Sequence, residues 1–251
     1  MATQDVEFAN VSFTLPGGRQ LLTDVSFTVE PGTTTALLGR SGSGKTTLLR
    51  TVNALVRPTG GRVLIGGQDV AARDAIALRR SIGYVIQDAG LFPHRRVPSN
   101  VGMPLEIADG IRNDAAYADK VVRAMALVGL DHKEFGRRYP WQLSGGQRQR
   151  AGVARALVAE PGVLLMDEPF GALDPLTRAE MQTMLRDLLR RVGVTTLIVT
   201  HDLDEALYLA DRVVLLQEGR VIIHLASSEM LSSENEAVKA YVAATRRGGR
   251  A

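Results

Sequence analysis

The feature that most constrains the fold of this chain is a glycine-rich segment directly after a short apolar run, residues 35–38. The segment matches the pattern G-x-x-x-x-G-K-[ST], which is typical of a phosphate-binding loop between a buried strand and a helix. Glycine permits a tight turn whose backbone N–H groups converge on an anion, and the helix adds its positive end. A plain glycine-rich turn would not need a strand before it and a helix after it. The predicted loop and its flank comprise Gly39, Arg40, Ser41, Gly42, Ser43, Gly44, Lys45, Thr46 and Thr47.

Two side chains of this loop have specific expected roles. Lys45 is expected to reach the β- and γ-phosphates of a nucleotide, and the Thr46 hydroxyl is expected to bind Mg²⁺.

Composition agrees with an ordinary compact chain. With 251 residues, 45% of them hydrophobic and 23% charged, the chain can bury a core as one large domain or as two lobes. The net charge of +3 is small for this length, so no nucleic-acid partner is expected. Much of the excess of basic residues lies in a tail at residues 246–250, which we expect to be solvated.

Cysteine is absent from the sequence, which excludes disulfides and thiolate-bound zinc. Residues 1–5 lack the features of a secretion signal, and nowhere do 18 apolar residues run together. We therefore expect a cytosolic chain that reaches a membrane only through a partner.

Hydrophobic periodicity predicts an α/β fold. Residues 6–11 and 25–29 alternate as strands of a half-exposed antiparallel sheet do, and most of residues 88–160 reads as helix, with Ser144 as an N-cap. Strand and helix then alternate to about residue 216, so a nucleotide-binding α/β lobe is interrupted by a helical lobe. The other predicted elements are helices at 45–55, 115–127, 178–191, 203–209 and 229–243, and strands at 62–65, 82–86, 163–166, 195–200 and 213–216.

A second chemical element is an apolar strand that ends in two carboxylates, Asp167 and Glu168. The strand places Asp167 at the carboxyl edge of a sheet, where it can help to hold Mg²⁺. Glu168 lies one residue further on and can orient or polarise an attacking water. Such a pair is commonplace alone, but downstream of a phosphate loop it indicates nucleotide hydrolysis.

A third element, Leu143 followed by Ser144, Gly145, Gly146 and Gln147, is a second anion-binding nest at a helix start. It resembles the signature of the ABC-transporter ATPases. In that family two copies pair head to tail, and each signature caps the γ-phosphate held by the other copy. The resemblance therefore implies a homodimer when ATP is bound.

The resemblance extends over nearly the whole chain. It implies that Gln87 touches Mg²⁺ and water, that Asp174 lies in a dimer-contact loop, and that His201 contacts the γ-phosphate. His132 and His224 have no such support and are expected at the surface.

The family fold implied is a P-loop NTPase (RecA-like) core with an N-terminal antiparallel β subdomain and an inserted α-helical subdomain. The expected division is residues 1–87 with 161–225 for the α/β lobe, 88–160 for the helical lobe, and 226–251 for a terminal helix and basic tail. The implied activity is hydrolysis of ATP with Mg²⁺, with Lys45, Glu168 and His201 as catalytic residues.

One position departs from the family pattern. The aromatic residue that usually stacks on adenine is replaced by Leu15, with Phe13 two residues earlier on the same strand face. Stacking is therefore either weakened or supplied by Phe13.

Residues 82–94 and 139–142 resemble the importer branch that serves glycine betaine, choline and related osmoprotectants. This implies a peripheral subunit on the cytoplasmic face of the membrane, which meets permease subunits through residues 87–94 and a solute-binding protein indirectly. Ordinary packing of the apolar turn at Phe92 is equally compatible with the sequence. An importer for another solute and a soluble, non-transport ABC ATPase remain alternatives.

Overall fold

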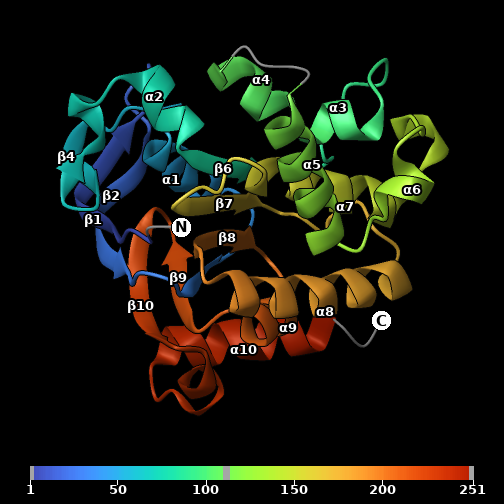
Figure 1. The fold of residues 1–251 in the computed structure, drawn as a ribbon. Helices are drawn as coiled ribbons and strands as arrows, with labels where there is room; N and C mark the ends of the chain where they lie inside the picture. The colour runs from blue at the N-terminus through green and yellow to red at the C-terminus, as the bar shows by residue number, and fades with distance from the viewer. Residues whose placement is uncertain (1–2, 110–113, 249–251) are drawn as a thin grey trace. The chain divides into compact units, whose positions relative to one another are not determined.

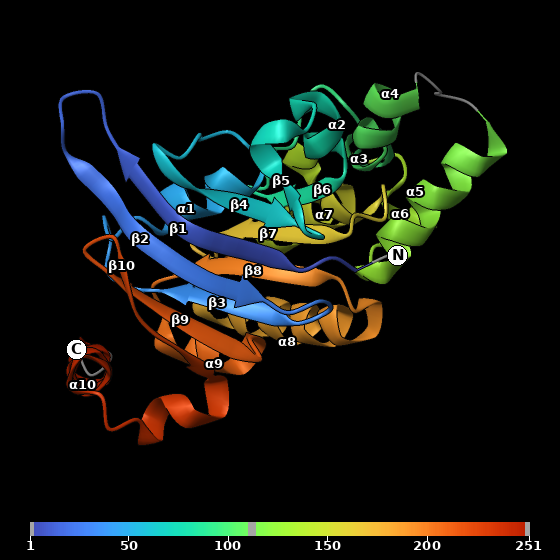
Figure 2. The ribbon, with the colours of Figure 1, turned by 90° about the vertical axis from the view of Figure 1, so that its left-hand side faces the viewer.

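The computed structural model describes residues 3–109 and 114–248, so the tail residues 249–251 and the side chains of 246–250 lie outside the described residues. The chain forms two compact units (Figures 1 and 2). One unit contains residues 76–194, and the other contains residues 3–75 together with residues from 195 onward. We call them the inserted unit and the loop unit, because the second carries the glycine-rich loop.

The loop unit contains an antiparallel sheet in the order β2-β1-β4-β5. Its strands are β1 (Val6–Thr14), β2 (Gln20–Val29), β4 (Gly60–Ile65) and β5 (Gln68–Asp69). Buried and more exposed residues alternate along much of β1 and β2, as they do where only one face of a sheet covers a core. The predicted antiparallel strands are confirmed, and both are longer than the alternation indicated.

A second sheet in the loop unit has the order β10-β9-β3-β8 (Figure 2). Every residue of β3 (Thr34–Leu38) and of β8 (Thr195–Thr200) is buried, because these strands are covered on both faces. β3 pairs in parallel with β8 on one side and with β9 (Arg212–Gln217) on the other. β10 (Arg220–Ala226) closes the edge as an antiparallel partner of β9.

The helices of the loop unit follow the ends of these strands. They are α1 (Lys45–Val52), the 3-10 helix η1 (Val70–Ala72), α9 (Leu203–Leu209), the 3-10 helix η3 (Ser227–Ser232) and α10 (Glu236–Gly248).

The inserted unit has two parallel strands and a set of helices. β6 (Ile82–Val85) pairs with β7 (Val163–Asp167), and α7 (Gly145–Leu157) packs against β6. The remaining helices are α2 (Ala75–Arg80), α3 (Val97–Val101), α4 (Met103–Asp109), α5 (Ala115–Leu127), α6 (His132–Phe135), the 3-10 helix η2 (Pro140–Gln142) and α8 (Pro175–Val192).

The predicted α/β class is confirmed. The compact units divide the chain differently from the predicted lobes, because β6, β7 and α8 belong with the helices of the inserted unit. No helix within the described ranges combines the length and the apolar character needed to cross a bilayer.

Candidate active site

The glycine-rich loop lies between β3 and α1, and two of its glycines are required by the packing around them. A Cβ on Gly39 would clash with the carbonyl oxygen of Leu216 on β9. Gly44 has a φ of +100°, and a Cβ there would lie 2.8 Å from the Leu22 side chain. The loop therefore runs so close to β2 and β9 that side chains are excluded at both positions.

Three observations show that this loop fits a phosphate group. Gly44 is the N-cap of α1, so no capping side chain stands at the start of this helix, where a phosphate would bind. The Ser43 hydroxyl is buried without a hydrogen-bond partner. Lys45, only 5% exposed, donates from Nζ to the carbonyl oxygens of Gly39 (2.8 Å) and Arg40 (2.9 Å), so its charge is held inside the loop.

His201 follows β8 at the same sheet edge as the loop. Leu38, the last residue of β3, pairs with Thr200, the last residue of β8, so Gly39 and His201 leave adjacent parallel strands side by side. The backbone around His201 is fixed by two hydrogen bonds: Asp202 N–H donates to Thr200 Oγ1 (3.0 Å), and Glu205 N–H donates to Asp202 Oδ1 (3.1 Å). The structure therefore brings His201 and the glycine-rich loop together.

Phe13 and Leu15, the two residues expected near the adenine base of the nucleotide, also belong to the loop unit. Phe13 is half-buried in β1, whereas Leu15 lies just beyond the strand and is 37% exposed. The pairing register between β1 and β2 shifts between Phe13 and Thr14. Strand alternation therefore does not continue regularly to Leu15, and a shared face for the two side chains stays a prediction.

Gln87, Asp167 and Glu168 lie together in the inserted unit. Val85 of β6 pairs with Met166 of β7, so Gln87 and the acid pair follow neighbouring carboxyl ends. The Tyr84 hydroxyl donates to Asp167 Oδ2 at 3.4 Å.

The chain turns sharply after the acid pair. Glu168 has a φ of +46°, an uncommon value for a residue with a Cβ and one that tends to occur at functional sites. Its carbonyl accepts a hydrogen bond from Gly171 N–H (3.2 Å). A Cβ on Gly171 would lie 3.0 Å from Gln87 Nε2, so the Gln87 side chain rests against this turn.

The signature segment begins α7. Ser144 is the N-cap, as predicted: its hydroxyl accepts from Gln147 N–H at 3.2 Å, and Gln147 Oε1 accepts from Ser144 N–H at 3.0 Å. A Cβ on Gly146 would lie 2.6 Å from Thr177 Cγ2 of α8, and one on Gly145 would meet the Leu173 side chain at 3.4 Å. Glycine thus lets α7 approach α8 closely.

Asp174 is fully exposed and caps α8, with Thr177 N–H donating to its Oδ1 at 3.1 Å. Hydrogen bonding by Thr177 lowers the pKa of this carboxyl, so Asp174 is ionised at neutral pH. The cap also explains why α8 begins at Pro175, earlier than predicted, because proline suits the first helical turn.

Sequence reasoning missed a residue that links the signature helix to the turn after Gln87. Arg155 of α7 donates from one guanidinium nitrogen to the Gly90 carbonyl (2.7 Å) and from the other to the Ala89 carbonyl. Burial lowers the pKa of this guanidinium, which still carries its charge. The positive φ values of Ala89 (+55°) and Gly90 (+56°) mark this turn, but the sequence offers no signal that pairs it with Arg155.

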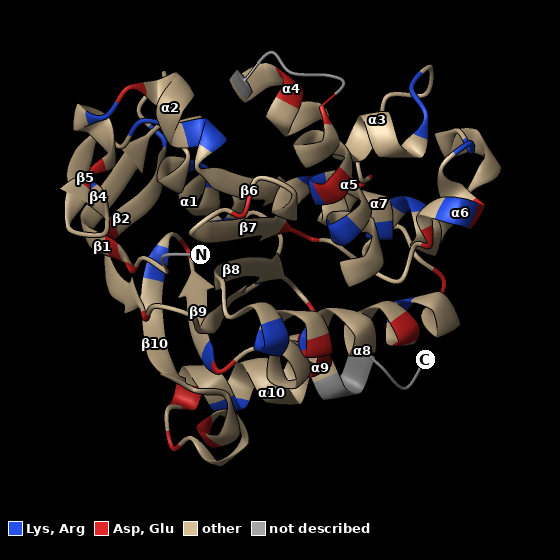
Figure 3. Cartoon of the chain, in the orientation of Figure 1, with Lys and Arg blue, Asp and Glu red and all other residues tan. Residues whose placement is uncertain are grey.

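The basic residues of α7, visible in Figure 3, are used inside the unit. Arg148 donates to the Leu143 carbonyl and Arg150 to the Val128 carbonyl, both at 2.8 Å. These arginines cap the carbonyl ends of neighbouring segments instead of forming an open basic stripe.

The turn at Phe92 combines a fixed backbone with an exposed side chain. Buried Asn100 accepts from Phe92 N–H (2.7 Å) and donates to the carbonyl oxygens of Phe92 (3.1 Å) and Arg95 (2.8 Å). The Phe92 side chain is nevertheless 41% exposed and contacts the His94 ring at 5.9 Å between centroids. The Phe92 side chain is therefore not part of the hydrophobic core.

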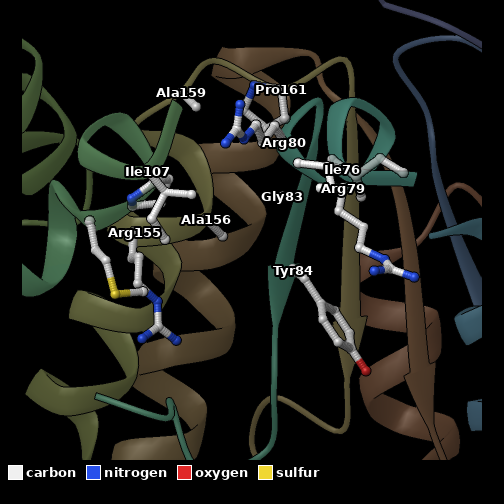
Figure 4. A pocket seen from close by; sticks show the side chains of 13 residues that line it. Ile76, Arg79, Arg80, Gly83, Tyr84, Ile107, Arg155, Ala156, Ala159 and Pro161 are labelled. Atoms are coloured by element: carbon white, nitrogen blue, oxygen red, sulfur yellow. The ribbon is translucent and has the colours of Figure 1, made fainter. Parts of the chain in front are cut away.

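The inserted unit also contains a largely apolar cavity of about 310 Å³. Figure 4 shows Ile107 and Arg155 on one side of it and Ile76, Arg79 and Tyr84 on the other. The cavity is lined mainly by apolar side chains, together with the arginines Arg79, Arg80 and Arg155.

Two expectations about histidines have different outcomes. His132 is exposed, as predicted. His224 is only partly exposed: its Nε2 accepts a hydrogen bond from Arg212 Nε (2.9 Å), and its ring meets the edge of Phe27. Partial burial, helped by the charge of Arg212, lowers the pKa of His224.

The candidate residues thus fall into two groups. The loop unit holds the glycine-rich loop with Lys45, Thr46 and His201, and the inserted unit holds Gln87, the acid pair and the signature segment. Across the described ranges no cluster of three or more His, Asp or Glu residues forms a ready metal site. Mg²⁺ needs no such cluster, because it is usually held by one or two protein groups together with phosphate oxygens and water.

Comparisons with known proteins identify relatives of this chain. The matching family is described as ABC transporter and covers residues 22–171. The carnitine transport ATP-binding protein OpuCA of Listeria monocytogenes is 42% identical over 217 residues, 86% of this chain. The glycine betaine uptake system ATP-binding protein YehX of Escherichia coli K12 is 44% identical over 217 residues, again 86% of this chain. The chain spans about half, 54%, of the length of the Listeria relative and 69% of the length of the other.

Solved structures agree with this placement. CbiO1 of Clostridium perfringens, part of the ABC transporter complex cbiONQ, superposes with a TM-score of 0.82 at 29% identity and covers 97% of each chain. A dimeric, post-hydrolysis structure of the ATP-binding cassette MJ0796 with ADP and phosphate gives a TM-score of 0.77 at 32% identity. It covers 88% of this chain and 98% of that one.

Proposed function

Because this chain belongs to the ABC transporter family, we propose that it hydrolyses ATP in the presence of Mg²⁺ and powers solute import through a membrane partner. The observation that carries this proposal is the placement of the candidate residues at paired strand ends. The glycine-rich loop and His201 leave β3 and β8, and Gln87 and the acid pair leave β6 and β7. Polar groups at the carboxyl ends of parallel strands are the usual location of nucleotide chemistry in such sheets.

The proposed reaction transfers the γ-phosphoryl group of ATP to water. Lys45 and the loop N–H groups bind the phosphates and stabilise charge that develops on them. Glu168 orients the water and accepts its proton, while His201 contacts the γ-phosphate. Thr46, Gln87 and Asp167 would help to hold Mg²⁺, which would further neutralise the phosphate charge.

We further propose that two copies close on ATP, with Ser144, Gly145, Gly146 and Gln147 of one copy facing the nucleotide of the other. The glycine-rich start of α7, where Ser144 is the N-cap, and the dimeric structure of MJ0796 support this arrangement. Asp174, ionised at the start of α8, is a proposed contact in the same dimer.

The proposed solute is a small osmoprotectant of the glycine betaine, choline or carnitine type. Two relatives matched over 86% of this chain are described as acting on carnitine and glycine betaine. Selection of the solute itself would lie in the permease and in an extracytoplasmic binding protein.

The proposed contact with the permease is the segment from Gln87 to His94, at the cytoplasmic face of the membrane. Its support is the rigidly held turn that presents the exposed Phe92 side chain. The cavity of Figure 4, which shares Tyr84 with the strand leading to Gln87, offers apolar surface for a helix of a partner.

We expect the chain to co-purify from detergent-solubilised membranes with an integral membrane subunit. Phe92→Asp should reduce recovery of that subunit, because a charge replaces the apolar contact, and mass spectrometry of the purified complex would measure it. Leu231→Asp is the matched control, since Leu231 is another exposed apolar residue, 53% accessible, but lies in η3 of the loop unit. Recovery without any membrane subunit would favour a soluble, non-transport ATPase.

Base selectivity is expected to be weak. Leu15 offers no aromatic face to adenine, so ATP and GTP affinities should differ by less than about tenfold, which is about 1.4 kcal/mol. Titration of the wild-type chain with the two nucleotides measures the ratio of Kd values. A hundredfold preference for ATP would show that another side chain supplies the stacking, and Phe13→Leu would then test the nearest aromatic residue.

A further inference from the structure

The helix α10 and the glycine-rich loop lie on opposite sides of a cavity of about 370 Å³. Residues of the loop, of β9 and the turn after it, and of α10 line this cavity, among them Arg40, Ser43, Leu216, Glu218, Ala237 and Tyr241. All of these residues belong to the loop unit. The helix is held firmly at its start: Asn235 Oδ1 accepts from Ala237 N–H (2.9 Å), and Val238 is 1% exposed.

Tyr241 reaches from α10 to the strand end that carries His201. Its hydroxyl donates to the backbone carbonyl of His201 at 3.2 Å. The Tyr241 side chain also lines the cavity that borders the glycine-rich loop. The hydroxyl thus fixes the backbone of the candidate γ-phosphate histidine.

The surroundings keep this hydroxyl in the protonated form that can donate. Burial raises the pKa of Tyr241 to about 12, with a further contribution from the charge of Asp202, whereas the charge of Arg40 acts in the opposite direction. The phenol is therefore protonated throughout the physiological range, and the hydrogen bond does not depend on pH there.

In the proposed reaction His201 must hold its position. It follows β8, which pairs with β3, the strand that leads into the glycine-rich loop. A preorganised donor contributes to rate only when its backbone is fixed before the reaction. The hydrogen bond from Tyr241 to the His201 carbonyl provides such a restraint.

We propose that Tyr241 is a positioning residue for hydrolysis, which ties α10 to the end of β8 and aligns His201 through its backbone carbonyl. This inference rests on the proposed function. Displacement of α10 would therefore break the hydrogen bond to the His201 carbonyl, and ATP turnover should become slower.

The test compares Tyr241→Phe with wild type in ATPase kinetics and in amide hydrogen exchange. Phenylalanine keeps the ring in the cavity and removes only the hydroxyl. We expect kcat to fall about two- to tenfold, the loss expected for one hydrogen bond, with the Kd for ATP within about twofold of wild type. Exchange of amides in residues 201–203 should become faster.

The matched control is Tyr208→Phe, which removes a hydroxyl from α9 at a side chain 37% exposed; its kcat should stay within about twofold of wild type. A double mutant distinguishes an effect of Tyr241 on the position of His201 from a general loss of stability. If Tyr241 acts through His201, Tyr241→Phe should cause no further loss of kcat when His201 is already Ala.

Three results would overturn the inference: unchanged kcat in Tyr241→Phe, exchange at residues 201–203 no faster than in the Tyr208 control, or a full additional loss in the His201→Ala background. Failure of the proposed function looks different, because the wild-type chain would then lack ATP turnover altogether. The exchange comparison would still test the hydrogen bond in that case.

Discussion

Glu168→Gln should slow ATP hydrolysis by about 10²- to 10³-fold while ATP still binds. Glutamine keeps the shape of the side chain and its ability to orient a water, but it cannot accept the proton. Binding should change little, because Lys45 and the loop N–H groups, which we propose to contact the phosphates, belong to the loop unit and not to the unit that contains Glu168. ATPase rates and nucleotide titration measure the two effects separately.

The same variant should accumulate as an ATP-bound dimer, because closure no longer ends in hydrolysis. Size-exclusion chromatography with light scattering, with and without ATP, measures this accumulation. Glu160→Gln is the matched control: it removes an equal charge from an exposed position of the same unit and should behave as wild type. Normal turnover in Glu168→Gln would contradict the role assigned to this carboxylate.

Ser144→Arg should abolish nucleotide-dependent closure and lower ATPase activity by about 10²-fold or more. The serine caps α7 and belongs to the proposed anion nest, where a long cationic side chain is expected to fill the space in front of the helix. ATP binding to the isolated copy should persist, because the glycine-rich loop is untouched.

The measurement is ATPase rate against enzyme concentration. For wild type, specific activity should fall on dilution, since an active site shared between two copies requires association. Ser144→Ala separates the missing hydroxyl from the added bulk, and Ser228→Arg places an arginine at an exposed serine far along the chain. If specific activity is independent of dilution and Ser144→Arg turns over normally, the two-copy mechanism is wrong.

Where local chemistry dominates, predictions from the sequence agree with the structure. Ser144 caps α7 because a serine hydroxyl satisfies an N–H group of the first turn, and this depends on neighbouring residues alone. β3 was predicted from a run of apolar residues before the glycine-rich loop, and every residue in it is buried. β1 was also predicted from a local pattern, since apolar and polar residues alternate along it with the period of two that a strand has.

Element ends and edges were harder to predict. The first predicted helix, 45–55, stops at Val52, because Asn53 turns the chain and Ala54 adopts a φ of +53°. The predicted terminal helix, 229–243, is two elements, η3 and α10, separated where Asn235 begins a new cap. β10 was not predicted, although its run of β-branched apolar residues is typical of a strand; it pairs with β9 as the antiparallel edge.

Motif order and residue type were thus sufficient to place the phosphate loop, the acid pair and the signature on their elements, since glycine turns, caps and strand runs are properties of short segments. The pairing of segments that lie far apart in the chain could not be predicted from the sequence in the same way. Parallel register sets Gly39 beside His201 and Gln87 beside Glu168, and the hydrogen bond from Tyr241 and the anchor at Arg155 join residues 40 or more positions apart. Such contacts depend on how packed elements meet in space, and a hydroxyl or a guanidinium in a sequence does not show which distant carbonyl it will reach.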